Sequence, residues 1–200
     1  MDTLQKLNVK IILGSTREGR FSDKAGAWVL EQARKQPVFE AEILDLRDYK
    51  MPFFEEKETP SSAKAPYTNP EVVKWAAKIA EADACIVIAP EYNHSFPAVL
   101  KNAFDYLSKQ WRQKPIGFIS YGTVGGARSV EQLRLVAIEL QMAPIRAAVH
   151  IPTPWNLPHN EAGELQAGAL DQYEKPTADF LTQLAWWGKA LKVARETPEA

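Results

Sequence analysis

Hydroxyl, guanidinium and glycine groups crowd one short segment near the amino terminus. Residues 14–23 run Gly-Ser-Thr-Arg-Glu-Gly-Arg-Phe-Ser-Asp. The hydroxyls of Ser15 and Ser22 and the guanidinium groups of Arg17 and Arg20 can donate hydrogen bonds to a phosphate, and a helix starting here would add free backbone N–H groups. A hydrogen bond to a charged partner contributes about 1.5–3 kcal/mol, and a helix terminus alone about 0.3–1 kcal/mol. The arginines and hydroxyls should therefore dominate the binding of a phosphate monoester.

Two familiar phosphate-binding motifs are absent from this segment. A Walker A loop requires a lysine after its second glycine, whereas Gly19 is followed by Arg20 and Phe21. The dinucleotide fingerprint G-x-G-x-x-G does not occur here either. From these residues alone, an ordinary strand-to-helix turn with solvated arginines remains an equal alternative to a phosphate site.

A second segment with chemical potential is bounded by prolines. Residues 90–97 run Pro-Glu-Tyr-Asn-His-Ser-Phe-Pro. Because proline restricts the backbone at both ends, Tyr92 and Asn93 are placed to border the polar edge of a planar ring. A rigid turn followed by a capping Ser95 is the alternative interpretation.

A third segment is rich in glycine. Residues 120–128 run Ser-Tyr-Gly-Thr-Val-Gly-Gly-Ala-Arg. Glycines at this density let the backbone approach a ligand closely and offer its N–H groups as donors. Such donors would stabilise a negative charge developing on the edge of a flavin ring. A merely flexible glycine turn is the alternative.

The elements that must position these segments alternate along the chain. Short apolar runs predict five strands, and segments of helical period predict five helices between and after them. Near-continuous apolar strands alternating with helices indicate a parallel sheet covered on both faces, with a ligand site beyond the carboxyl ends of strands one, three and four. The predicted strands are Val9–Leu13, Ala41–Leu46, Ala84–Ala89, Ile116–Ser120 and Ile145–Ile151, and the predicted helices Asp23–Gln36, Pro70–Ala82, Pro97–Lys109, Ser129–Gln141 and Gln172–Ala194.

Helix boundaries and loops carry further signals. Ser22 or Asp23 is expected to cap the first helix, Asn69-Pro70 begins the second with proline at its first position, and Pro97 opens the third. Two long segments, 49–68 and 152–171, resist assignment to helix or strand. Loops of this length usually serve a function or carry a short insertion.

Composition bounds the class of protein. The chain has 200 residues, 46% of them hydrophobic and 24% charged, which predicts one soluble domain spanning residues 1–200. A formal net charge of -1 and a pI near 6.3 argue against attraction of the whole protein to nucleic acid or to an anionic membrane. The first six residues show no secretion signal, and no apolar run approaches the ~20 residues of a membrane helix, so a cytoplasmic location is expected.

The residue pattern shows no disulfide framework, no zinc site and no catalytic acid-base or nucleophile arrangement. Cys85 is the only cysteine and lies in an apolar run, which excludes a disulfide framework. His94, His150 and His159 lack the spacing of a zinc site. No paired carboxylates or nucleophile-base arrangement stand out, so no catalytic acid or base and no metal ligand is nominated.

Taken together, the three segments resemble the NADPH-dependent FMN reductase family. The resemblance rests on G-S-T-R at 14–17, P-E-Y-N-H-S-F-P-A-V-L-K-N-A-F-D-Y-L at 90–107 and S-Y-G-T-V-G-G-A-R at 120–128. It spans about the first 140 residues, and the long second stretch is the specific part. It implies a flavodoxin-like α/β fold with a five-stranded parallel sheet of order 2-1-3-4-5, helices on both faces, and FMN as cofactor.

The resemblance also implies three sets of cofactor-binding residues. The first set would hold the FMN phosphate, the second would border the isoalloxazine ring, and the third would close the other edge of that ring. His94 occupies a variable position, either against the flavin or at a subunit interface. The three sets are Ser15, Arg17, Arg20, Phe21 and Ser22; Pro90, Glu91, Tyr92 and Asn93; and Tyr121, Gly122, Thr123, Gly125 and Gly126.

The implied activity is oxidoreduction. NADPH or NADH would deliver hydride to the flavin, which would pass electrons to a small acceptor such as a flavin, a quinone or an azo compound. A non-catalytic electron carrier of the flavodoxin type is the alternative, although such carriers are usually strongly acidic and this chain is near neutral. The resemblance, with the aromatics at 49–54 and the pair Trp186-Trp187, further predicts a homodimer or homotetramer.

Overall fold

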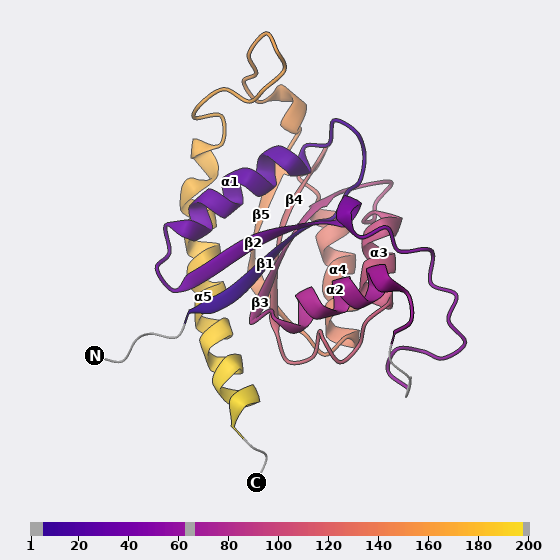
Figure 1. Cartoon of the computed structure of the whole chain (residues 1–200). Coiled ribbons are helices and arrows are strands. Elements are labelled where there is room, and N and C mark those ends of the chain that lie inside the picture. The colour runs from indigo at the N-terminus through magenta and orange to yellow at the C-terminus, as the bar shows by residue number, and fades with distance from the viewer. Residues whose placement is uncertain (1–5, 63–66, 198–200) are drawn as a thin grey trace.

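The computed structural model describes residues 6–62 and 67–197, which form one parallel sheet between two layers of helices (Figure 1). The five strands lie in the order β2-β1-β3-β4-β5, as predicted. The strands are β1 (Leu7–Leu13), β2 (Phe39–Asp45), β3 (Ala84–Pro90), β4 (Pro115–Gly122) and β5 (Ala143–Pro152), and the helices α1 (Ser22–Arg34), α2 (Pro70–Ala80), α3 (Ala98–Asp105), α4 (Ala127–Glu139) and α5 (Glu174–Glu196).

The two faces of the sheet bury separate cores because successive strand side chains point to opposite faces. Side chains from α1 and α5 pack on one face, around Ile11, Ile86 and Phe180. Side chains from α2, α3 and α4 pack on the other, around Val87 and Phe118. β1, β3 and β4 are buried almost throughout, which explains why their sequences are mostly apolar.

Two of the predicted helix boundaries are wrong for identifiable reasons. α3 ends at Asp105 rather than Lys109, because the chain turns so that Trp111 enters the core and its indole donates to the Phe104 carbonyl at 3.2 Å. The N-cap of α1 is Phe21, with no side-chain cap. The expected cap residues are used elsewhere: Ser22 bonds Tyr121, and Asp23 accepts from Arg20.

The start of α2 is confirmed as predicted. The Asn69 side chain accepts from the backbone N–H groups of Glu71 and Val72, and Pro70 occupies the first turn. Asn102 in α3 holds the preceding long segment, accepting from the Phe54 N–H at 2.9 Å and donating to the Pro52 carbonyl at 2.7 Å. Part of that segment, residues 63–66, lies outside the described residues, as do the two ends of the predicted 1–200 domain.

The outer edge of β5 is covered by side chains from the neighbouring helices. Gln183 of α5 accepts from the Ala147 N–H at 2.7 Å. Arg134 of α4 donates to the carbonyls of Ile145 and Arg146 at 2.5 and 3.0 Å. One backbone N–H and two backbone carbonyls in the middle of this edge strand are therefore hydrogen-bonded to helix side chains.

Two kinds of feature are absent from the described residues. None of the helices there combines the length and the apolar character that a membrane crossing demands. No group of three or more His, Cys, Asp or Glu side chains in the same part of the chain is arranged to hold a metal ion.

Candidate functional site

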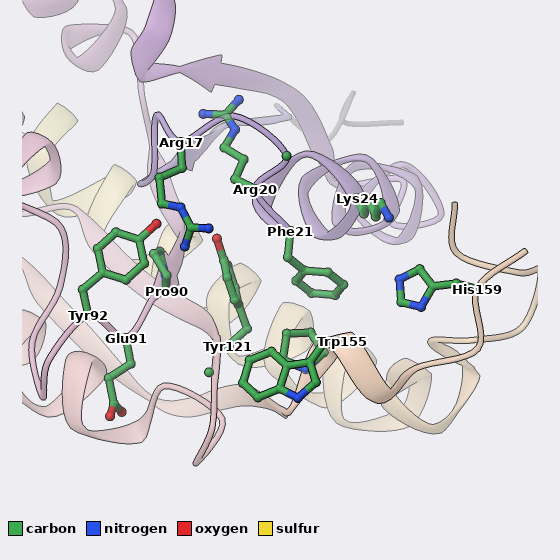
Figure 2. A pocket seen from close by; sticks show the side chains of 13 residues that line it. Arg17, Arg20, Phe21, Lys24, Pro90, Glu91, Tyr92, Tyr121, Trp155 and His159 are labelled. Atoms are coloured by element: carbon green, nitrogen blue, oxygen red, sulfur yellow. The ribbon is translucent and has the colours of Figure 1, made fainter. Parts of the chain in front are cut away.

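A cavity of about 400 Å³ opens where the predicted loops meet, at the carboxyl ends of the strands (Figure 2). Parallel pairing sets the loops side by side: Leu13 pairs with Ile88, and Pro90 pairs with Tyr121. The loops that follow β1, β3 and β4 therefore emerge at one edge of the sheet, where ligands of doubly wound folds bind.

The loop after β1 turns sharply at Gly14. A Cβ atom at this position would lie 2.9 Å from the Leu100 side chain and 3.0 Å from the Ile88 carbonyl oxygen, so only glycine fits without displacing its neighbours. Ser15 is fully buried beyond it, and its hydroxyl lies 2.7 Å from the Tyr92 hydroxyl. The first and second loops are thus joined by a hydrogen bond.

The two arginines of the first loop point in different directions (Figure 2). Arg17 is exposed, and its guanidinium lies 5.8 Å from the centre of the Tyr92 ring at the mouth of the cavity. Arg20 is buried, and its guanidinium donates to Asp23 and Asp45 at 2.9 Å and also to the Ser15 carbonyl. Arg17 is available to an anion, whereas Arg20 is committed to two carboxylates.

The Arg20 ion pairs perturb the carboxyl group at the end of β2. Burial by itself would raise the pKa of Asp45, but hydrogen bonds from Arg20 and Arg47 outweigh it and lower the pKa to about 2. The Asp45 side chain is only 19% exposed, so solvent screens these bonds weakly. This cluster fixes the base of the loop after β1 against β2.

Tyr121 at the end of β4 forms the floor of the cavity. Its hydroxyl lies 2.6 Å from the Ser22 hydroxyl, and its ring makes an edge contact with Phe21 at a centroid distance of 5.1 Å. Burial raises the pKa of Tyr121 to about 12, so the phenol is neutral over the physiological range and can donate a hydrogen bond.

The loop after β3 closes into a tight turn. The backbone N–H and carbonyl groups of Tyr92 and Ser95 pair with each other, and the two residues between them, Asn93 and His94, have φ of 50° and 72°. Two successive left-handed residues are typical of a type I′ turn, in which asparagine is favoured at the first position. The turn exposes Asn93 and His94 at its tip.

A buried carboxylate joins this turn to the glycine-rich loop. The Glu91 side chain is 5% exposed and accepts from the Arg128 guanidinium at 2.6 Å and from the Arg128 backbone N–H at 3.3 Å. The same guanidinium contacts His94 Nε2 at 2.7 Å. Because an arginine can only donate, His94 Nε2 accepts in this contact.

Glycine is required at two positions of the third loop. Gly125 and Gly126 have φ of 73° and 79°, and a Cβ on Gly126 would lie 2.8 Å from the Tyr121 backbone nitrogen. The Ser120 hydroxyl donates to the Gly125 carbonyl at 2.7 Å, which fixes the loop. Since that hydroxyl has one proton, His150 Nδ1, 2.8 Å away, must donate to Ser120.

Comparison with known proteins identifies the family. The NADPH-dependent FMN reductase family matches residues 7–156, three quarters of the chain and all three loops. The chain belongs to this family. An NAD(P)H-dependent FMN reductase of Schizosaccharomyces pombe is 35% identical over 155 residues, covering 76% of this chain and 78% of the relative. A quinone reductase of Escherichia coli K12 is 33% identical over 144 residues, covering 68% and 72%.

The fold of this FMN reductase family member also matches solved structures. The flavoenzyme NAD(P)H:acceptor oxidoreductase FerB of Paracoccus denitrificans superposes with a TM-score of 0.71 over 92% of this chain and 98% of its own, at 21% identity. At that identity the likeness supports the fold alone, which is the flavodoxin-like arrangement expected from the sequence.

Most of the residues nominated for cofactor binding lie together. The cavity of this FMN reductase family member is lined by eight of them: Arg17, Arg20, Phe21, Pro90, Glu91, Tyr92, Tyr121 and Gly122. Ser15 and Ser22 lie beneath it, bonded to its two tyrosines. Asn93, Thr123, Gly125 and Gly126 follow directly on the two loops but do not line the cavity.

Five lining residues were not nominated from the sequence: Gly19, Lys24, Pro154, Trp155 and His159. The last three come from the segment after β5, beyond the three motifs on which the sequence resemblance rests. The length and proline content of this segment indicate a functional loop, but no motif connects it to the loops after β1, β3 and β4. Only the tertiary structure brings Trp155 beside Phe21 (Figure 2).

Proposed function

We propose that the chain is an NAD(P)H-dependent oxidoreductase that holds FMN across the loops after β1, β3 and β4. The observation that carries this proposal is the convergence of Arg17, Tyr92 and Tyr121 on one cavity of about 400 Å³ in a member of the FMN reductase family. That volume lies within the range typical of small-molecule sites, about 300–1,000 Å³.

The donor set of the first loop fits a phosphate monoester. Arg17 supplies a free guanidinium, and the hydroxyls of Ser15 and Ser22 lie buried beside it. Both hydroxyls now bond tyrosines, so each can turn its proton to an incoming anion while it keeps accepting from its partner. Arg20 serves the same phosphate indirectly, because its carboxylate partners hold the loop in shape.

The second and third loops fit the polar edge of a flat ring. Pro90 to Asn93 present a stiff backbone edge, and Tyr121 to Gly126 present a backbone with few side chains in the way. The Glu91 carboxylate is turned away to Arg128, which leaves the backbone of this loop facing the cavity. Asn93 and Thr123 are exposed at the loop tips, where they can border the bound ring.

Bound FMN would supply the redox chemistry, accepting a hydride from NADPH or NADH and reducing a small acceptor such as a flavin or a quinone. The work of the protein is to bind, orient and exclude water. Because the flavin would supply the redox chemistry, no residue of the chain is assigned as a catalytic acid or base. The curated relatives named above reduce FMN and quinones, which supports both as candidate acceptors here.

The test begins with purified protein titrated with FMN, followed by flavin absorption and the shift in melting temperature. NADPH and NADH oxidation is then measured with FMN or a quinone as acceptor. We expect a bound yellow flavin, a higher Tm with FMN and turnover with at least one nucleotide. A protein that gains no stability from FMN would refute the cofactor assignment. Tight FMN binding with negligible NAD(P)H oxidation would instead support an electron carrier.

We also propose that the chain forms a homodimer or homotetramer. Trp186 and Trp187 in α5 are 64% and 37% exposed, and Phe53 is 72% exposed, so large aromatic surfaces are available to a partner copy. Tyr49, in contrast, belongs to the core and packs on Trp75. Size-exclusion chromatography with light scattering measures the assembly, and a strict monomer would contradict it.

A further inference from the structure

One end of the cavity is built mostly by residues outside the three flavin loops. Lys24, Trp155 and His159 line it together with Phe21 of the first loop, and this end is called here the aromatic end. Trp155 is 60% exposed. Figure 2 shows its indole beside Phe21, and it shows His159 on the same side of the cavity as Lys24. An indole exposed on a cavity wall leaves a large apolar surface in water, which a flat ligand would cover.

Trp155 is held in place by the backbone around it. It is the middle residue of the 3₁₀ turn Pro154–Asn156, and Pro154 is buried. Thr153 precedes the turn with φ of 42°, an unusual conformation for a β-branched residue. The Thr153 N–H donates to the Gly122 carbonyl at 2.8 Å, which ties the turn to the glycine-rich loop. Such strain is often retained where it fixes a functional side chain.

The aromatic end carries positive charge. The Lys24 ammonium donates to the Gly163 carbonyl at 2.6 Å, which uses one of its three N–H groups. His159 Nδ1 donates to the Leu157 carbonyl at 2.6 Å, which fixes the orientation of the imidazole at this end of the cavity. Glu91 is the single acidic residue among those lining the cavity, and Arg128 already neutralises it.

We propose that the aromatic end binds the electron acceptor, and that this acceptor is a planar aromatic molecule with an acidic substituent, such as a hydroxy-substituted quinone. The inference rests on the proposed function. The ring stacks on Trp155, and the anionic oxygen pairs with Lys24. Reduction of the quinone to the hydroquinone adds a hydride from reduced FMN and one proton from solvent, which together supply two electrons and two protons.

The first experiment measures binding without turnover. FMN-loaded protein is titrated by calorimetry with 2-naphthoate and with its neutral analogue 2-naphthamide, neither of which is a quinone. We expect tighter binding of the naphthoate. Trp155→Ala should weaken both ligands about tenfold, because it removes the stacking surface. Lys24→Met should weaken only the naphthoate, while the control Leu135→Ala, at an exposed position of α4 outside the cavity, should change neither.

The second experiment measures turnover at saturating NADPH with 2-hydroxy-1,4-naphthoquinone and 2-methoxy-1,4-naphthoquinone. Trp155→Ala should raise both acceptor KM values, and Lys24→Met only that of the hydroxyquinone, with FMN Kd and NADPH KM within about twofold of wild type. Equal affinity for charged and neutral ligands overturns the inference. The inference is also overturned if Trp155→Ala changes only FMN Kd or only NADPH KM.

The two proposals can fail separately. Wild-type protein that binds naphthoate as expected but never oxidises NAD(P)H would refute the proposed function, whereas the binding site at the aromatic end would still be supported.

Discussion

The hydroxyl oxygens of Ser22 and Tyr121 lie 2.6 Å apart, although 99 residues separate them along the chain. Both side chains are buried, so each hydroxyl depends on the other for its hydrogen bond. The pair connects the start of α1 to the carboxyl end of β4, and with it the phosphate loop to the floor of the cavity. A parallel contact between Ser15 and Tyr92 connects the phosphate loop to the turn after β3.

Removing one hydroxyl of the Ser22 and Tyr121 pair should lower the free energy of unfolding by more than the net contribution of their hydrogen bond. Ser22→Ala or Tyr121→Phe leaves a buried hydroxyl without a partner, and we expect each to lower the free energy of unfolding by about 1–3 kcal/mol. The double variant should lose less than the sum, because no orphan hydroxyl remains. Urea unfolding of all four proteins measures the cycle, and strictly additive losses would show that the bond contributes nothing.

Substitutions of Arg17 and Arg20 should affect different properties: FMN affinity for Arg17 and stability for Arg20. Arg17→Ala removes a charged donor from the cavity mouth, so FMN Kd should rise about tenfold to a hundredfold while Tm stays nearly constant. Arg20→Ala leaves Asp45 without its buried partner and should lower the free energy of unfolding by about 3 kcal/mol. Calorimetry and thermal unfolding separate the two effects. Unchanged FMN affinity in Arg17→Ala would place the phosphate elsewhere.

The left-handed glycines offer a matched pair. Gly126→Ala should cost about 2–4 kcal/mol of unfolding free energy, because the residue has φ of 79° and the new Cβ would lie 2.8 Å from the Tyr121 nitrogen. Gly19→Ala should cost only about 1–2 kcal/mol, because φ is 63° but no atom lies within 4 Å. Equal costs would mean that the crowding at Gly126 is relieved by loop movement.

Stability should fall in acid through Asp45. Its pKa is about 2 in the folded chain against an ordinary value of 3.8, so the unfolded chain takes up the proton first as the pH falls. The contribution of Asp45 is therefore complete above pH ~5 and should shrink by about 1 kcal/mol by pH ~3. Unfolding free energies of wild type and Asp45→Asn, measured across this range, should converge toward low pH. Parallel curves would show that another carboxyl group dominates.

The sequence was a reliable guide to the sheet because its signals are local. Apolar runs and the helices between them predicted the five strands, and Asn69-Pro70 predicted the start of α2. The strand order came from the resemblance to the FMN reductase family. The roles of the two arginines in the loop after β1 could not be predicted. Nothing in the sequence distinguishes the exposed Arg17 from the ion-paired Arg20. The difference depends on Asp45, which another strand places 2.9 Å from the Arg20 guanidinium.

Trp155 and His159 mark the other limit of sequence reasoning. Neither belongs to the three motifs on which the sequence resemblance rests: Trp155 lies at the end of the stretch that matches the family and His159 beyond it. No spacing pattern relates them to Phe21 or Lys24. Their place in the cavity follows from the course of the chain after β5, where the Thr153 N–H meets the Gly122 carbonyl. Contacts of this kind are set by backbone conformation and appear only in three dimensions.

The covered edge of β5 limits how this protein can associate. A second copy that approached the middle of β5 would meet backbone groups that are already engaged, because Gln183 holds the Ala147 N–H and Arg134 holds the carbonyls of Ile145 and Arg146. Growth into a shared sheet or a fibril by this route would first have to release both side chains. Any assembly that uses this side of the molecule is therefore expected to join through helices, with α5 and its tryptophans as the exposed neighbour.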